Sequence, residues 1–300
     1  MRPNTPFLGT LCTAMVTPFD SQLQLDRDRL CSLADFLLDQ GSDALVAVGT
    51  TGESPTLTHA EKIEIYTILA QHLKGRAPLI AGTGSYSTAE AVSLSQAAEK
   101  AGADALLVVN PYYNKPSQEG LFQHFSAVAQ AVEIPVILYN HPGRTGVALS
   151  VETVCRLAEI ANIVAIKDSS GDLIFLSELR RRLPEFVIYS GDDPLTLPIL
   201  AIGGQGVISV ASHVAGKEIK ALLTAFASGQ LAEAQRLHLA LLPLARVLFC
   251  APSPSPTKAA LALCDMPVGG VRLPLTALTE AESELVSQTW NAFVKECRAQ

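Results

Sequence analysis

Short runs of apolar residues recur along the chain, bounded by turn residues and separated by segments with helical spacing. Continuous apolar runs, as opposed to alternating ones, are typical of parallel strands buried on both faces. Between the first two runs, Leu30, Leu33 and Leu37 stand at i, i+3 and i+7, the spacing of a helix with one apolar face. The expected strands are residues 10–16, 44–48, 79–81, 105–109, 136–139, 163–167, 186–189 and 206–210.

A strand followed by a helix, repeated eight times, predicts a closed (β/α)8 TIM barrel. A weak internal repeat supports this fold, since Gly41 and Gly102 each end an expected helix before a buried strand, where a left-handed glycine is favoured. A doubly wound open sheet is the competing fold. That fold usually carries a glycine-rich phosphate loop, and the sequence contains neither GxGxxG nor GxxxxGK[ST].

We assign residues 1–230 to the catalytic barrel and residues 231–300 to a C-terminal helical appendage. Residues 215–248 are rich in Ala and Leu and predict one long helix, which a proline-rich connection follows. Further helices are expected over residues 257–263 and 279–298. Such helices gain their stability chiefly by packing on the barrel.

Composition excludes several classes of protein. The 300 residues are 48% hydrophobic, which excludes disorder, and 22 basic against 29 acidic residues give a net charge of −7. A chain with this negative net charge lacks the basic surface that binds nucleic acid or an anionic membrane. No apolar run approaches the roughly 20 residues that cross a bilayer. Residues 1–9 show no signal-peptide pattern, so we expect a cytoplasmic protein that binds small molecules.

The cysteines indicate neither disulfides nor a metal site. They form no CxxC pair and have no histidine at ligand spacing, so all six are expected to be small buried hydrophobes. They are Cys12, Cys31, Cys155, Cys250, Cys264 and Cys297.

Lys167 is the main candidate for chemistry, because barrel enzymes place working groups at the C-terminal ends of strands. It alone among the lysines ends an apolar strand, and period-two alternation puts it on the inward face with Ala165 and Ile163. Burial there favours the free amine, which is the form that attacks a carbonyl to make a Schiff base. The alternative is a lysine paired with a carboxylate at the barrel rim.

Three neighbouring features would support such a lysine. Tyr139 ends the adjacent strand, about 4.8 Å away, and could transfer protons or simply pack. The Gly-Thr-Thr-Gly turn at residues 49–52 could bind a carboxylate or phosphate, or be an ordinary turn. Arg144 could hold a substrate carboxylate or form a surface ion pair. Glu53 is expected to make a structural contact beneath the threonine turn.

Six motifs occur in register along the chain. They are GTTGES at 49–54, PYYNKPSQEGL at 111–121, YNxPxRTG at 139–146, IKD at 166–168, SGDD at 190–193 and GVISV at 206–210. Together they resemble the dihydrodipicolinate synthase family, also called 4-hydroxy-tetrahydrodipicolinate synthase, within the pyruvate-dependent class I aldolase superfamily. The resemblance runs from Gly9 to about Thr276.

The resemblance implies an enzyme that condenses pyruvate with L-aspartate 4-semialdehyde in the diaminopimelate route to lysine. It implies that Lys167 forms a covalent imine with pyruvate, without a cofactor or metal, and that Tyr139 donates and accepts protons. Sibling pyruvate lyases, acting on N-acetylneuraminate or 2-keto-3-deoxy sugar acids, share both residues but usually lack the Arg-Thr-Gly that follows the tyrosine. They are the alternative, together with a non-catalytic small-molecule-binding barrel.

Further roles follow from the same resemblance. Thr50 and Tyr113 match the rest of the proton relay, and Tyr113 is lent across a subunit interface, which implies a homotetramer built from dimers. Thr51 and Ile208 match residues that contact pyruvate. Arg144 matches the residue that receives the carboxylate of the semialdehyde.

Many family members are inhibited by L-lysine at a subunit interface, and six positions of this chain correspond to that site. They are Ser54, His59, Lys62, Tyr86, Glu90 and Tyr112. Two depart from the lysine-sensitive pattern, with Lys62 in place of a histidine and Tyr86 in place of an asparagine. We therefore expect weak or absent inhibition by lysine.

Overall fold

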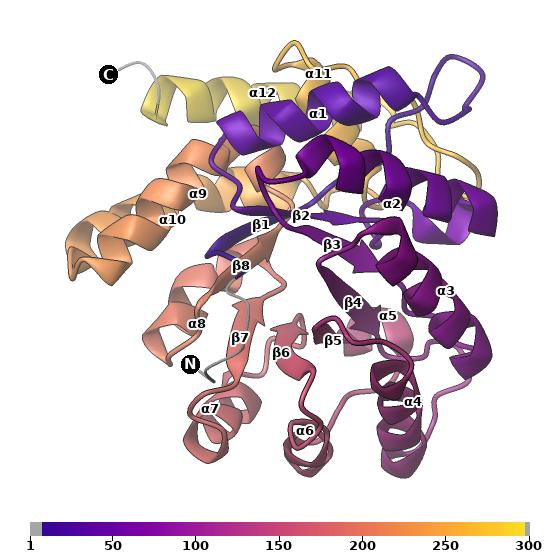
Figure 1. Ribbon diagram of the computed structural model, residues 1–300. Coiled ribbons are helices and arrows are strands. Elements are labelled where there is room, and N and C mark those ends of the chain that lie inside the picture. Colours follow the sequence, from indigo (N-terminus) through magenta and orange to yellow (C-terminus); the bar gives the residue numbers. More distant parts are fainter. Residues whose placement is uncertain (1–7, 298–300) are drawn as a thin grey trace.

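The computed structural model describes residues 8–297 and confirms the predicted TIM barrel. Eight parallel strands pair in chain order, and the last pairs with the first to close the barrel. Figure 1 shows the helices arranged around these strands. The strands are β1 (Leu11–Ala14), β2 (Ala44–Ala47), β3 (Leu79–Gly82), β4 (Ala105–Val109), β5 (Val136–Asn140), β6 (Ile163–Asp168), β7 (Val187–Ser190) and β8 (Gly206–Ser209).

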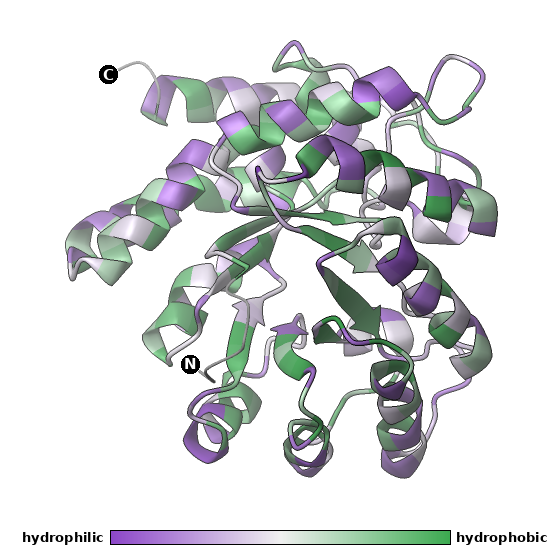
Figure 2. Ribbon diagram, viewed as in Figure 1, coloured by the Kyte–Doolittle hydropathy of each residue, from purple (hydrophilic) through white to green (hydrophobic). Residues whose placement is uncertain are grey.

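Helices follow each strand and cover the outside of the barrel. The helices of the barrel are α1 (Arg27–Asp39), α2 (His59–Leu73), α3 (Thr88–Ala101), α4 (Gln118–Gln130), α6 (Val151–Leu157), α7 (Leu173–Arg182), α8 (Thr196–Ala201) and α9 (Ser212–Ala227). Short helical turns also follow three strands, namely η1 (Ser54–Thr56), α5 (Pro142–Thr145) and η2 (Asp193–Leu195). In Figure 2 the strands are mainly hydrophobic, whereas the helices carry both hydrophobic and hydrophilic residues. This is the expected division between doubly buried strands and half-buried helices.

The apolar side chains form two cores, one inside the barrel and one between the barrel and its helices. Ala165 belongs to the interior core, as predicted, but Ile163 packs in the outer core. The cause is a register shift, because Ile137 pairs with Ala165 while the residue before it pairs with Ile163. One extra residue in β6 moves the alternation by one position. The prediction that Ile163 shares the face of Lys167 is therefore wrong.

The predicted continuous helix over residues 215–248 is also wrong. The chain breaks after α9 at Gly229, whose φ is +75°, and resumes as α10 (Leu231–Val247). A left-handed glycine ends a helix even where the apolar pattern continues. The remaining helices are α11 (Ser255–Ala262) and α12 (Glu280–Cys297), and α10 packs against both α9 and α12. The division into a barrel over residues 1–230 and an appendage over 231–300 stays a prediction.

Local signals in the sequence had mixed outcomes. Gly41 and Gly102 have φ values of +100° and +98° and end α1 and α3, as predicted. Cys12 is buried, but the expectation was wrong for the other five cysteines, which are partly exposed.

Within residues 8–297, no helix is both long enough and apolar enough to span a bilayer. The expected lack of a signal peptide concerns mainly residues 1–7, which lie outside the described residues.

Candidate active site

A cavity of about 230 Å³ lies at the C-terminal ends of β2 to β5. Thr50, Tyr139 and Arg144, three of the predicted catalytic and binding residues, line it together. Gly82 and Gly84 leave room on the β3 side, and the remaining walls are largely apolar. A concave, mostly apolar site with a few convergent polar groups is typical of small-molecule binding.

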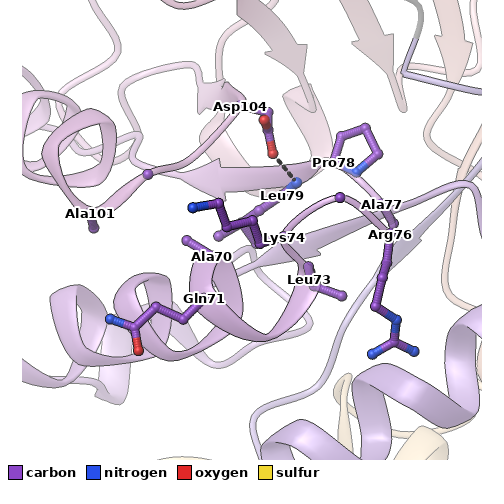
Figure 3. A pocket seen from close by; sticks show the side chains of 12 residues that line it. Ala70, Gln71, Leu73, Lys74, Arg76, Ala77, Pro78, Leu79, Ala101 and Asp104 are labelled. Carbon is purple, nitrogen blue, oxygen red and sulfur yellow. Dashed lines mark hydrogen bonds between the residues drawn. The ribbon is translucent and has the colours of Figure 1, made fainter.

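A larger hollow of about 670 Å³ lies at the opposite, N-terminal face, between the ends of α2 and α3 (Figure 3). Two of its polar side chains form hydrogen bonds within the fold. Asp104 accepts a hydrogen bond from the backbone N–H of Leu79 at 2.8 Å, and Arg76 donates to Asp35 at 2.6 Å. Barrel enzymes use the C-terminal face for chemistry, so the smaller cavity is the candidate active site.

Lys167 stands beside that cavity at the end of β6 and is only 5% exposed. The strand register places it directly between Tyr139 on β5 and Tyr189 on β7. Its Nζ lies 4.3 Å from the centre of the Tyr139 ring, as expected for a cation over an aromatic face. In the described part of the chain no carboxylate forms an ion pair with Lys167. The paired-lysine alternative is therefore not observed there.

The two tyrosines beside Lys167 differ in how their hydroxyls are used. The hydroxyl of Tyr189 donates to the carbonyl of Gly9 at 2.9 Å, and burial raises the pKa of its phenol. The hydroxyl of Tyr139 has no hydrogen-bond partner among residues 8–297, and Tyr139 is one of the residues that line the cavity. Of the two phenols, that of Tyr139 is thus the one available to a substrate.

Gly191 makes room for the lysine, although the sequence assigned it no role. A Cβ at this position would lie 2.9 Å from Cε of Lys167 and 2.1 Å from Oγ of Ser169. Any side chain would therefore displace one of them. A glycine after a strand end is common in turns, so only the three-dimensional contact singles it out.

A buried polar network fixes Tyr139 relative to Lys167. The Nδ2 of Asn140 donates to Asp168 at 2.8 Å, and the Nδ2 of Asn110 donates to Asn140 at 3.0 Å. Burial raises the pKa of the Asp168 carboxyl, while its hydrogen-bond donors oppose the shift. These contacts tie together the C-terminal ends of β4, β5 and β6, where the two key side chains are attached.

Hydrogen bonds hold the threonine turn in place. The backbone N–H of Glu53 donates to the carbonyl of Thr50 at 3.1 Å, and the hydroxyl of Thr17 donates to the carbonyl of Gly52 at 2.6 Å. Glu53 makes the expected structural contact, with its carboxylate 2.7 Å from Nζ of Lys258. Thr51 is buried and does not line the cavity.

The other predicted residues lie around this centre. Arg144 is exposed on α5, and within the described residues its guanidinium makes no ion pair, so the surface-pair alternative is not observed. Ile208 is fully buried inside the barrel, outside the lining of the cavity. Tyr113 is 91% exposed and also stands outside the lining.

Four of the six positions that correspond to a lysine site lie close together, namely Lys62, Tyr86, Glu90 and Tyr112. The rings of Tyr86 and Tyr112 meet edge to face with centroids 5.4 Å apart. Burial lowers the pKa of Lys62, and the neighbouring Glu90 carboxylate opposes that shift. Ser54 and Tyr112 both line the active-site cavity itself, whereas His59 is exposed at the start of α2.

The fold and the cavity define an enzyme built on a (β/α)8 barrel, with its polar groups at the C-terminal ends of the strands. Residues 7–293 match the model of the Dihydrodipicolinate synthetase family, and the chain belongs to that family.

Individual relatives are similar over nearly the whole chain. The 4-hydroxy-tetrahydrodipicolinate synthase of Desulforudis audaxviator is 53% identical over 92% of this chain and 94% of its own length. A dihydrodipicolinate synthase structure from Bacillus anthracis has a TM-score of 0.94 at 48% identity, covering 95% of this chain and 98% of that one. The enzyme of Cyanidioschyzon merolae, solved with lysine bound, has a TM-score of 0.93 at 44% identity, with 95% and 98% covered.

Proposed function

We propose that the protein is a 4-hydroxy-tetrahydrodipicolinate synthase, which condenses pyruvate with L-aspartate 4-semialdehyde. The observation that carries the proposal is the buried amine of Lys167, set over the ring of Tyr139. Tyr139, Thr50 and Arg144 share one cavity beside it. The names of the most similar relatives support the same activity.

The chemistry begins with attack of the Lys167 amine on the ketone carbon of pyruvate. Water leaves, and the protonated imine withdraws electrons, so the methyl group loses a proton and an enamine forms. The enamine then attacks the aldehyde carbon of the second substrate. Tyr139 donates and accepts the protons, and Thr50 relays them. Because the lysine itself supplies the electron sink, the reaction needs no further cofactor.

Substrate binding is assigned to groups around this centre. The exposed guanidinium of Arg144 receives the carboxylate of the semialdehyde through two parallel hydrogen bonds. Thr51 and Ile208 contact pyruvate, largely through their backbone. We place the reaction in the cytoplasm.

Tyr113 is the third member of the relay and acts in the active site of a neighbouring subunit. Its 91% exposure leaves the side chain accessible to a neighbouring subunit, and its φ of +74° is a strained backbone conformation of the kind that clusters at functional sites. The protein accordingly assembles as a homotetramer built from dimers.

Replacing Tyr113 by Phe is expected to lower kcat more than it weakens pyruvate binding, because only the hydroxyl is lost. Steady-state kinetics in both substrates measure the difference. Unchanged kinetics would remove Tyr113 from the relay.

Subunit exchange then tests whether Tyr113 acts in the active site of a neighbouring subunit. Mixed tetramers of Tyr113→Phe and Lys167→Ala chains should be more active than either parent, since one chain supplies the lysine and the other the tyrosine. Mixtures no more active than the Tyr113→Phe parent would show that Tyr113 serves its own chain.

L-lysine is expected to inhibit weakly or not at all. At the matched site the ammonium of Lys62 would repel that of the inhibitor, by about 4 kcal/mol at 4 Å with an effective dielectric constant near 20. Turnover is measured against lysine concentration in the wild type and in Lys62→His, which should be the more sensitive. An inhibition constant below the millimolar range in the wild type would contradict this expectation.

Turnover with the second substrate tests the proposed activity. Consumption of pyruvate with L-aspartate 4-semialdehyde, and no cleavage of N-acetylneuraminate or of 2-keto-3-deoxy sugar acids, is the expected result. The reverse preference would identify a sibling pyruvate lyase. Binding of pyruvate without turnover of any of these compounds would identify a non-catalytic barrel.

A further inference from the structure

Glu53 follows the threonine turn directly and has an unusual backbone. Its φ of 56° and ψ of 35° are left-handed, and the residue is 1% exposed. The backbone of a residue other than glycine is strained in this conformation, which persists only where surrounding contacts hold it. The contacts of Glu53 therefore decide the shape of the turn that carries Thr50.

Both carboxylate oxygens of Glu53 contact the C-terminal part of the chain. Oε1 lies 2.7 Å from Nζ of Lys258 on α11, and Oε2 accepts a hydrogen bond from the backbone N–H of Arg272 at 3.0 Å. No other carboxylate pairs with Lys258 in the described part of the chain. The strained turn of the active site thus rests on contacts from outside the eight barrel units.

Lys258 is itself firmly placed. It is 5% exposed, its Nζ donates to the carbonyl of Gly270 at 2.6 Å, and the ammonium lies 4.3 Å from the centre of the Phe19 ring. Burial lowers the pKa of Lys258, and the charge of Glu53 opposes the shift. A buried ammonium and a buried carboxylate each depend on the other, because either one alone would be an uncompensated charge.

Arg272 fixes the second contact. Its guanidinium donates to both carboxylate oxygens of Glu61 on α2, at 2.7 and 3.0 Å, and to the carbonyls of Leu23 and Thr56. These bonds hold Arg272, whose backbone N–H donates to Glu53, against α2. Both partners of Glu53 are therefore held in place by further contacts.

We propose that Lys258 is a positioning residue, which through its ion pair with Glu53 holds the left-handed turn that presents Thr50 to the cavity. The inference rests on the proposed function, because it takes Thr50 to be part of the proton relay. Lys258 does not touch the substrate. The region after the barrel then contributes to turnover as well as to stability.

A second ion pair provides a matched control. Lys220 on α9 pairs with Asp43, with its Nζ 2.5 and 2.6 Å from the two carboxylate oxygens. Asp43 precedes β2, whereas Glu53 follows it, so the two pairs lie at opposite ends of the same strand. Lys220→Met should alter stability and leave the threonine turn in place.

The test compares Lys258→Met, the double variant Glu53→Gln/Lys258→Met, and Lys220→Met, each at a temperature where circular dichroism shows it folded. The double variant leaves no uncompensated buried charge. It therefore tests the positioning role of Lys258 even if the single variant Lys258→Met does not fold. We expect its kcat to fall about 10- to 100-fold, since small misplacements of catalytic groups have effects of this size. Pyruvate KM should stay close to the wild-type value, and amide exchange should accelerate over residues 49–54.

Two results would overturn the inference. One is a folded double variant with wild-type kcat, and the other is an equal loss of kcat in Lys220→Met, which would show that Lys258 acts only through global stability. Failure of the proposed function is distinguishable, because the wild type itself would then not turn over aspartate semialdehyde. In that case faster exchange over residues 49–54 in the double variant would still support the coupling, and unchanged exchange would refute it.

Discussion

Lys167→Ala is expected to abolish the pyruvate adduct that borohydride traps on the wild-type protein, and turnover should fall to the detection limit. The proposed function makes the amine of Lys167 the nucleophile, and this amine belongs to a side chain that is 5% exposed and adjoins the candidate active-site cavity. Intact-protein mass spectrometry after reduction measures the adduct. Lys167→Arg should lose it as well, because a guanidinium keeps the positive charge but cannot form the imine.

The control for this prediction is Lys220→Ala, which removes a lysine at the far end of the barrel and should keep the adduct. A stoichiometric adduct on the Lys167→Ala protein would show that another lysine is the nucleophile. The assignment of the active site to the end of β6 would then be wrong.

Tyr139→Phe is expected to lower kcat by about 10²- to 10⁴-fold, the range of general acid–base catalysis. The substitution keeps the ring beneath the ammonium of Lys167 and removes only the hydroxyl. Borohydride should still trap the imine, but single-turnover kinetics should show that the imine forms more slowly.

Tyr189→Phe is the matched control, because Tyr189 flanks Lys167 on the other side and its hydroxyl is bound to the carbonyl of Gly9. That variant should lose about 1 kcal/mol of stability and keep its kcat. Similar losses of kcat in the two variants would contradict the assignment of the proton transfer to Tyr139.

The barrel could be predicted because each strand is buried on both faces and therefore appears as an unbroken apolar run. The same property hides the details of register. Nothing in a continuous apolar run marks the extra residue in β6 that turns Ile163 outward, since either face accepts an isoleucine. Likewise the apolar pattern runs on through Gly229, and only its left-handed backbone separates α9 from α10.

The positions of the candidate site residues were predictable where they lie at or just after strand ends. Lys167 and Tyr139 occupy such ends, Thr50 lies in the turn after β2, and Arg144 lies on α5 after β5, so motifs and position indicated all four. The supporting contacts were not predictable from local sequence. Gly191 matters only because a Cβ would strike Lys167.

Glu53 shows the same limit. Its structural role could be expected from its place beneath the turn, but its partners could not. Lys258 and Arg272 lie far along the chain, and nothing local to either residue indicates Glu53. Such pairings are set by tertiary packing.

The most direct test of the central claim is to locate the pyruvate imine on the wild-type protein. Protein incubated with pyruvate and reduced with borohydride is digested, and the modified peptide is identified by mass spectrometry. The account predicts one pyruvate-derived group per chain, on the peptide that contains Lys167. A group on any other lysine, or no trapped group at all, would contradict it.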